Sequence, residues 1–141
     1  MRSEGQLSEK SFHFIVDGAH NAGAADKMAE SVRHYFNGKK LIYIMGVFAD
    51  KEYKIVLEKT AHFAEKIYTI ETPDNPRALP AEELAKAARV YNSSAESTKS
   101  IKDAVEKAFS CAGDDENSVI LAFGSLSFIG ALTDAVEEYV G

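Results

Sequence analysis

Short apolar runs alternate along the chain with longer segments in which apolar residues recur every three or four positions. A compact apolar run bounded by polar or glycine residues is typical of a buried strand, and the wider spacing is typical of an amphipathic helix. The runs predict strands at Phe12–Val16, Leu41–Met45, Lys66–Ile70 and Val119–Phe123, with one more short strand within Val90–Ala95.

Each segment between and after these strands has one apolar face, which predicts a helix. Asn37-Gly38 is a helix-ending pair, Pro80 suits a helix start, and Ser100 is a favourable N-cap. The predicted apolar faces are Ala25, Met28, Val32, Tyr35 and Phe36; Tyr53, Val56, Leu57, Thr60 and Ala64; Leu84, Ala87, Ala88 and Tyr91; Ile101, Ala104, Val105, Ala108 and Phe109; and Phe128, Leu132, Ala135, Val136 and Tyr139.

Strands that alternate with helices at this spacing predict an α/β fold with a mostly parallel sheet, right-handed crossovers and helices on both faces. In a parallel sheet all strands end on the same side, where ligands bind against helix N-termini. The loops predicted to converge there are Asp17–Asn21, Gly46–Lys51, Thr72–Pro80 and Gly124–Ser127.

Composition narrows the class of protein. The 141 residues predict one domain, 12–141, preceded by a tail or linker remnant at 1–11. The start is polar, unlike a signal peptide, and no run approaches the roughly 18 apolar residues of a membrane span. The single cysteine, Cys111, excludes an internal disulfide and a cysteine-rich metal site, which fits the cytoplasm. A net charge of −6 without a basic stripe argues against nucleic-acid binding.

The first converging loop, Asp17-Gly18-Ala19-His20-Asn21, places an acid, an imidazole and an amide in one strand-to-helix turn. Asp17 is a candidate to bind a ribose hydroxyl or a metal-bound water, and His20 to face an anion. The structural alternative is equally open, because an Asp at this position often caps the following helix and His20 is then a surface side chain.

The other loops each hold one polar candidate. Lys51 enters a helix, where the helix dipole opposes a cation and an anionic ligand would compensate. Pro73 and Pro76 restrict the loop that carries Arg77, whose guanidinium matches a carboxylate bidentately. Ser125 is placed to offer a hydroxyl to a carboxylate or to cap a helix. A solvated surface side chain is the alternative for Lys51 and Arg77.

Absent motifs set limits on the chemistry. The chain has neither a Gly-x-x-x-x-Gly-Lys-Ser/Thr phosphate loop nor a Gly-x-Gly-x-x-Gly fingerprint, so another domain must hold the β and γ phosphates of any nucleoside triphosphate. No Gly-x-Ser-x-Gly elbow makes Ser125 a nucleophile. His13, His34 and His62 lack the spacing of metal ligands, so no metal site is predicted in this chain.

Four segments, taken in order, resemble one family. Val-Asp-Gly-Ala-His-Asn, Gly-Val-Phe-Ala-Asp-Lys, Thr-Pro-Asp-Asn-Pro-Arg-Ala-Leu-Pro-Ala-Glu-Glu-Leu and Gly-Ser-Leu-Ser-Phe-Ile-Gly-Ala-Leu are similar to the C-terminal domain of folylpolyglutamate synthase, including the bifunctional dihydrofolate synthase form, in the Mur ligase superfamily. The likeness runs from about Phe12 to the end of the chain. It implies a three-layer, Rossmann-like fold of the Mur ligase C-terminal type.

The resemblance implies part of an ATP-dependent ligase that adds glutamate to folates through an acyl phosphate. It also implies an N-terminal ATPase domain that carries the phosphate loop and most of the Mg²⁺ ligands, so this chain is not expected to be active alone. ATP, Mg²⁺, L-glutamate and a folate are thus the implied cofactors and partners.

Site residues follow from the matched motifs. The resemblance implies that Asp17, His20 and Asn21 bind ATP. It implies that glutamate is bound by Lys51, Asn75, Arg77 and Ser125. His20 is the candidate that accepts the proton lost by the glutamate amine. The family often has proline where this chain has Ala22, a difference that is expected to alter rigidity more than chemistry.

Other functions stay open from the sequence. Another Mur-type ligase with a different amino acid is the nearest alternative, although Phe48 and the Asn-Pro-Arg-Ala-Leu-Pro segment favour the folate branch. A receiver-like signalling module also alternates strands and helices, but Asp17 lacks the acidic cluster that such a module needs. A ligand-binding domain without catalysis is the third alternative.

Overall fold

The computed structural model describes residues 2–5, 14–17, 22–36, 38–49, 53–72, 76–113, 117–124, 134–135 and 137, with the backbone alone at 2–5, 14–17, 22, 24 and 123–124. Six strands, four α-helices and one short 3₁₀-helix are assigned within these residues. In chain order they are β1 (Arg2–Gly5), β2 (Phe14–Asp17), α1 (Ala22–Tyr35), β3 (Lys40–Gly46), α2 (Tyr53–Thr60), η1 (Ala61–Phe63), β4 (Lys66–Thr69), α3 (Ala81–Arg89), β5 (Glu96–Ser97), α4 (Ile101–Ala112) and β6 (Ser118–Gly124).

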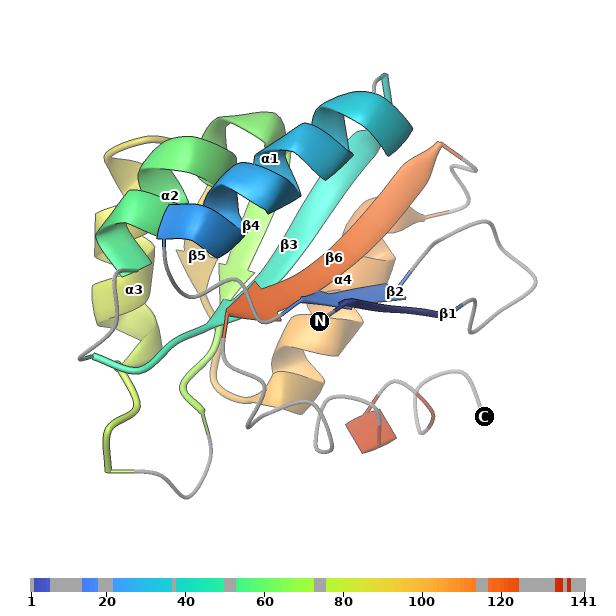
Figure 1. The fold of residues 1–141 in the computed structure, drawn as a ribbon. Helices are drawn as coiled ribbons and strands as arrows, with labels where there is room; N and C mark the ends of the chain where they lie inside the picture. The colour runs from blue at the N-terminus through green and yellow to red at the C-terminus, as the bar shows by residue number, and fades with distance from the viewer. Residues whose placement is uncertain are drawn as a thin grey trace.

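The strands form one sheet in the order β1-β2-β6-β3-β4-β5 (Figure 1). All neighbouring pairs from β2 to β5 are parallel, and only β1 runs antiparallel, at the edge beside β2. The prediction of a mostly parallel α/β sheet is therefore confirmed.

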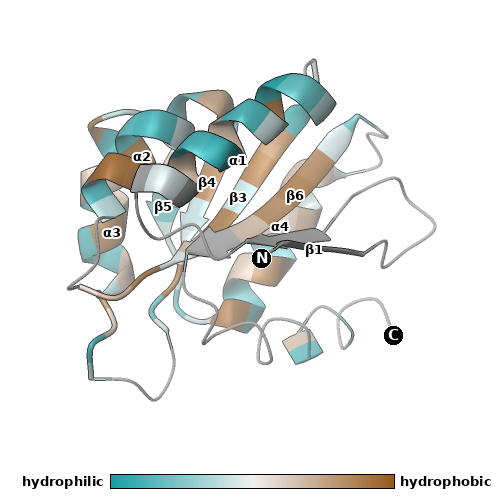
Figure 2. Ribbon diagram, viewed as in Figure 1, coloured by the Kyte–Doolittle hydropathy of each residue, from teal (hydrophilic) through white to brown (hydrophobic). Residues whose placement is uncertain are grey.

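Two apolar cores lie on opposite faces of the sheet, and the alternation of β3 separates them. Leu41, Tyr43 and Met45 belong to the core formed with α1, α2 and α3. Ile42 and Ile44, between them, belong to the core formed with α4. Because both faces are covered, β3 is a continuous apolar run, and Figure 2 shows this run as a brown interior under helices with teal outer faces. Helices on both faces make the three-layer arrangement expected from the sequence.

Local signals fix the helix ends as predicted. The Ser100 hydroxyl accepts a hydrogen bond from the Asp103 amide at 3.0 Å, and the Asp103 carboxylate accepts one from the Lys99 amide at 3.0 Å. The Ser100 bond satisfies an amide of the first turn of α4, and the Asp103 bond ties this turn to the residue before the N-cap. Beyond α1, Gly38 has φ of 82°, a left-handed conformation that glycine adopts without a Cβ penalty.

The short strand predicted before the fourth amphipathic segment, β5 in the structure, is not where the pattern predicted it. It was expected within Val90–Ala95, but the strand is Glu96–Ser97. The physical reason is a turn centred on Asn92, whose Oδ1 accepts hydrogen bonds from the Ser94 amide at 3.0 Å and hydroxyl at 2.6 Å. An Asn side chain that bonds two residues ahead stabilises a turn, so extended pairing starts only after it.

The chain start also differs from the expectation. Residues 1–11 were interpreted as a tail or linker, whereas Arg2–Gly5 forms an edge strand paired with Phe14–Asp17. Its sequence, Arg-Ser-Glu-Gly, contains no large apolar residue, which is why the pattern did not reveal a strand. That these residues also connect to a preceding domain stays a prediction.

The structure differs from the predicted apolar faces at two tyrosines and describes only part of the predicted last helix. Tyr35 and Tyr91, predicted on apolar helix faces, are 61% and 40% exposed. Of the predicted final helix, only residues 134, 135 and 137 are described, as helical, and Ala135 packs against the α4 core.

Candidate functional site

The parallel register aligns the ends of four neighbouring strands. Asp17 pairs with Phe123, Gly46 with Gly124, and Met45 with Thr69. We call this side the carboxyl end of the sheet and the opposite side the amino end. The loops after β2, β6, β3 and β4 therefore leave the sheet side by side, as the sequence predicted, and α1, α2 and α3 follow three of them.

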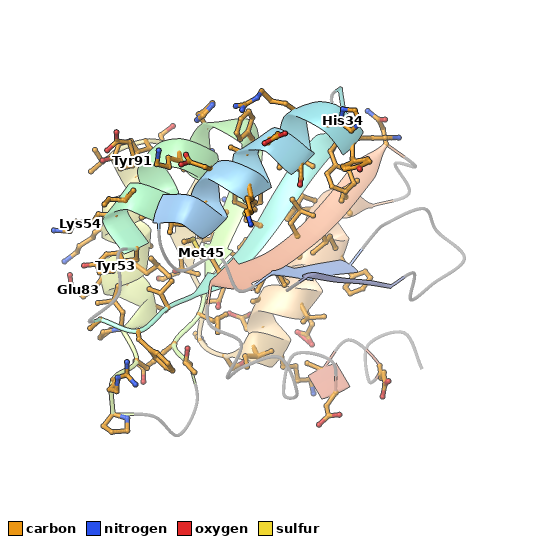
Figure 3. All side chains as sticks on the ribbon, in the orientation of Figure 1. His34, Met45, Tyr53, Lys54, Glu83 and Tyr91 are labelled. Atoms are coloured by element: carbon orange, nitrogen blue, oxygen red, sulfur yellow. The ribbon has the colours of Figure 1, made fainter. Side chains whose placement is uncertain are left out.

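Helix N-termini consequently gather at the carboxyl end. In Figure 3, Tyr53, Lys54 and Glu83 mark the first turns of α2 and α3 at this end, whereas His34 marks the last turn of α1 at the amino end. Unpaired amides and the helix dipoles make such N-termini favourable for anions.

The structure places two of the predicted site residues. Asp17 is the last residue of β2, and its backbone lies at the carboxyl end beside β6. Arg77 lies in the loop after β4, also at the carboxyl end, and its side chain is exposed. The remaining candidates, His20, Asn21, Lys51, Asn75 and Ser125, lie outside the described residues, so their placement stays a prediction.

The loops after β3 and β4 pair with each other. The Ala49 amide donates to the Arg77 carbonyl at 2.8 Å, and the Leu79 amide donates to the Val47 carbonyl at 3.0 Å. Phe48 and Ala78 form an antiparallel bridge between these two bonds. Figure 1 shows both segments extending from the same end of the sheet, at the lower left. Residues 47–49 and 77–79 therefore form a small paired arm, which fixes the backbone of Arg77.

Arg77 also contacts the arm through its side chain. The guanidinium carbon lies 4.7 Å from the centroid of the Phe48 ring. A guanidinium over an aromatic face at this distance is a cation–π interaction. Sequence reasoning singled out Arg77 but missed Phe48 as its partner, because nothing in the spacing of the two loops reveals that they pair.

Gly46, the last residue of β3, lies in close contact with Ile70 just before the arm. A Cβ built on Gly46 would lie 2.6 Å from Cδ1 and 2.9 Å from Cγ1 of Ile70, which is fully buried. Only glycine allows β3 and the residue after β4 to approach this closely. The sequence marked Gly46 as a strand end without indicating this contact.

Hydroxyl groups near the end of β4 have two different environments. Thr69 donates to the Ala81 carbonyl at 2.7 Å and so ties the strand to the start of α3. Thr72 is 1% exposed, and its Oγ1 has no hydrogen-bond partner within the described part of the chain. Thr69 thus serves the fold, and Thr72 is a buried polar group at the carboxyl end whose hydroxyl the described residues do not satisfy.

Acidic groups here do not assemble a metal site among the described residues, where no cluster of three or more His, Cys, Asp or Glu side chains is found. Glu82, in the first turn of α3, has its pKa lowered, first by a hydrogen bond from Ser97 and then by one from Arg89. The Arg89 contact measures 3.2 Å. This carboxylate is therefore paired within the fold. No helix in the described ranges has the length and apolarity needed to cross a bilayer.

Comparison with known proteins identifies the domain. The family model described as "Mur ligase, glutamate ligase domain" matches residues 1–126. The chain belongs to this family. The match sets aside the receiver-like alternative and agrees with the resemblance drawn from the four motifs.

Relatives in this family include the dihydrofolate synthase/folylpolyglutamate synthase of Bacillus subtilis strain 168, which is 29% identical over 114 residues, 81% of this chain and 25% of the relative. The chain therefore spans about a quarter of the length of this curated relative.

Solved structures show the same fold. Folylpolyglutamate synthase from Mycobacterium tuberculosis, complexed with ADP and AMPPCP, superposes with a TM-score of 0.80 at 23% identity, covering 95% of this chain and 31% of that one. A bifunctional folylpolyglutamate synthase/dihydrofolate synthase with Mn, AMPPNP and L-glutamate bound gives a TM-score of 0.76 at 21% identity, covering 93% and 30%. The Mur ligase C-terminal type of fold is thereby confirmed.

Proposed function

We propose that this chain is the glutamate-binding, and part of the nucleotide-binding, domain of an ATP-dependent ligase that adds glutamate to folates. The observation that carries the proposal is the aligned carboxyl end of the sheet, where Arg77 is exposed on a paired arm among helix N-termini. L-Glutamate is a small dianion, so an acidic domain binds it only through such local positive charge.

The proposed reaction has two steps. ATP phosphorylates a carboxylate of the folate and leaves as ADP, which gives an acyl phosphate. The glutamate amine then attacks the acyl carbon, phosphate leaves, and an amide bond forms while the amine loses a proton. Catalysis of this kind depends mainly on positioning and on stabilising negative charge.

Each candidate residue has a place in this scheme. Arg77 pairs with a carboxylate of the incoming glutamate, and Lys51, Asn75 and Ser125 contribute further contacts to it. Asp17, His20 and Asn21 border the nucleotide, and His20 accepts the proton from the amine. Their positions in loops that leave adjoining strand ends support a shared site.

ATP and Mg²⁺ need a second domain. This chain has no phosphate loop and, in its described part, no cluster of metal ligands, so an N-terminal ATPase domain would hold Mg²⁺ and the β and γ phosphates. In this proposal the carboxyl end of the sheet faces the ATPase domain and closes over it. The protein would act in the cytoplasm, without nucleic-acid or membrane partners. This chain would be inactive alone.

The decisive test is an assay of the full-length protein that includes this chain and an ATPase domain. With ATP, Mg²⁺ and a reduced folate, we expect a mass increase of one glutamate and release of phosphate. A panel of other amino acids tests the alternative of a Mur-type ligase with another substrate. Transfer of a different amino acid, or none, would overturn the folate assignment.

Variants of the untested residues refine the same assay. His20→Gln is expected to lower kcat more than it raises the glutamate KM, since a proton acceptor acts in the chemical step. Ser125→Ala and Asn75→Ala are expected to raise the glutamate KM and leave kcat nearly unchanged. Full activity in all three variants would reject these site assignments.

A further inference from the structure

The Phe48–Arg77 pair joins two loops that leave different strands. The arm fixes the backbone of Arg77 through the bonds from Ala49 and Leu79, but a long arginine side chain on an exposed loop has many rotamers of its own. The ring of Phe48, whose centroid lies 4.7 Å from the guanidinium carbon, restricts that side chain.

We propose that Phe48 is a positioning residue, whose ring holds the Arg77 guanidinium ready for the carboxylate of the incoming amino acid. This inference rests on the proposed function and names a residue on which its affinity for glutamate depends. Phe48 itself contacts neither substrate nor nucleotide in this account.

The geometry of a guanidinium makes the two contacts compatible. Stacking on Phe48 uses the planar face of the group, while carboxylates bind to the N–H edge in the plane. Stacking on the face therefore does not place the ring in the way of a carboxylate at the edge. Restricting the side chain before binding reduces the entropy lost on binding, which raises affinity without any new contact to the ligand.

The chain supplies its own control. Arg33 of α1 lies over the ring of Phe63 in η1, with 5.9 Å between the guanidinium carbon and the ring centroid. This second pair has the same chemistry but lies at the amino end of the sheet, since η1 directly precedes β4. Loss of the Phe63 ring is therefore expected to leave substrate affinity unchanged.

The test measures the glutamate KM and kcat in the full-length protein. Phe48→Leu keeps an apolar side chain without a π face, and we expect the glutamate KM to rise about 2- to 5-fold with kcat unchanged. Phe48→Tyr keeps the ring face and should restore a nearly wild-type KM. In an Arg77→Ala background, Phe48→Leu should have no further effect, and Phe63→Leu should leave KM unchanged.

A spectroscopic measurement separates positioning from misfolding. The side-chain protons of Arg77 should show an upfield ring-current shift in NMR spectra, lost in Phe48→Leu and kept in Phe48→Tyr. Unchanged or lowered KM in Phe48→Leu, or a shift that persists without the ring, would overturn the positioning role alone. No glutamate transfer by the wild type would overturn the proposed function as well.

Discussion

Two pairs of loops, one at the amino end of the sheet and one at the carboxyl end, are joined in different ways. At the amino end, the Asn92 amide donates to the carbonyls of Ala61 and Ala64 at 2.8 and 2.7 Å, and the Asn117 amide donates to the Gly38 carbonyl at 2.7 Å. Polar side chains there bind one loop to the backbone of the next. At the carboxyl end, the loops after β3 and β4 are joined by hydrogen bonds between their backbone groups.

This difference shows where a ligand can be accommodated. An amide that satisfies two carbonyls has no remaining donor for a substrate. The backbone at Arg77 is held by the bonds between the two loops, and its side chain is exposed. The hydrogen bonds of Asn92 and Asn117 at the amino end stabilise the fold, whereas we propose binding at the carboxyl end, and mutation can test this division at each end.

The largest effect is expected from Arg77→Ala. Loss of charge-assisted hydrogen bonds should raise the glutamate KM about 10- to 100-fold, with a small change in stability. Steady-state kinetics of the full-length protein measure this, and Arg33→Ala is the matched control from the amino end. An equal rise of the glutamate KM in Arg77→Ala and Arg33→Ala would show that the two ends do not differ in binding.

Asn92→Ala should lower stability and leave the glutamate KM unchanged. It removes two hydrogen bonds to carbonyls and the turn-forming acceptor, so the free energy of unfolding should fall by about 2 kcal/mol. Urea unfolding measures the loss, and Asn92→Asp, which keeps an acceptor but lacks the donors, should be destabilised as well. A changed glutamate KM in the folded variant would show that the amino end also serves binding.

Gly46→Ala tests the close contact at the carboxyl end. Its Cβ would overlap Ile70, and the expected destabilisation is about 1–2 kcal/mol, typical of overpacking a dense core. Adding Ile70→Val removes the nearest methyl group, so the double variant should lose less stability than the two single variants summed. Simple additivity in thermal unfolding would mean that the two positions do not constrain each other.

The smallest effect concerns an ion-pair cluster away from both loop systems. Glu96 of β5 accepts from Lys107 at 2.9 Å and Lys66 at 3.1 Å, and these bonds lower the pKa of its carboxyl. A carboxyl whose pKa is lower in the folded state stabilises the fold at pH values above its unfolded-state pKa. This stabilisation is lost as the pH falls through the folded-state pKa. Since Glu96 and both lysines are partly exposed to solvent, which screens the ion pairs, Glu96→Gln should cost less than about 1 kcal/mol at pH 7.

The pH dependence supplies the control for that prediction. The difference in unfolding free energy between wild type and Glu96→Gln should be constant near neutrality, begin to shrink near pH 4, where an unfolded glutamate protonates, and disappear as the pH falls through the lower pKa of the folded state. A difference that grows on acidification would contradict the assignment of the lowered pKa to Glu96.

Much of the fold was predictable because its signals are local. β3 and β6 are continuous apolar runs since both faces of the sheet are covered, and Ser100 caps α4 through its own neighbour Asp103. Short polar strands gave no such signal. β5 has 2 residues, both polar, so no apolar run marks Glu96 and Ser97 as a strand.

The site was predictable in outline only. Parallel strands require their following loops to converge, which placed Arg77 correctly at the carboxyl end. Its partner Phe48 lies on a separate loop, and the two residues meet because these loops pair with each other. The Gly46–Ile70 contact likewise depends on how β3 and β4 pack, which no periodicity reports.

Hydrogen–deuterium exchange tests the central claim most directly. The full-length protein would be compared with and without saturating L-glutamate and a non-hydrolysable ATP analogue, with Mg²⁺ present. The account predicts slower exchange in peptides spanning 46–49 and 76–80, and unchanged exchange at 61–65 and 90–95. Protection confined to the amino-end peptides, or none at the carboxyl end when binding is saturated, would contradict it.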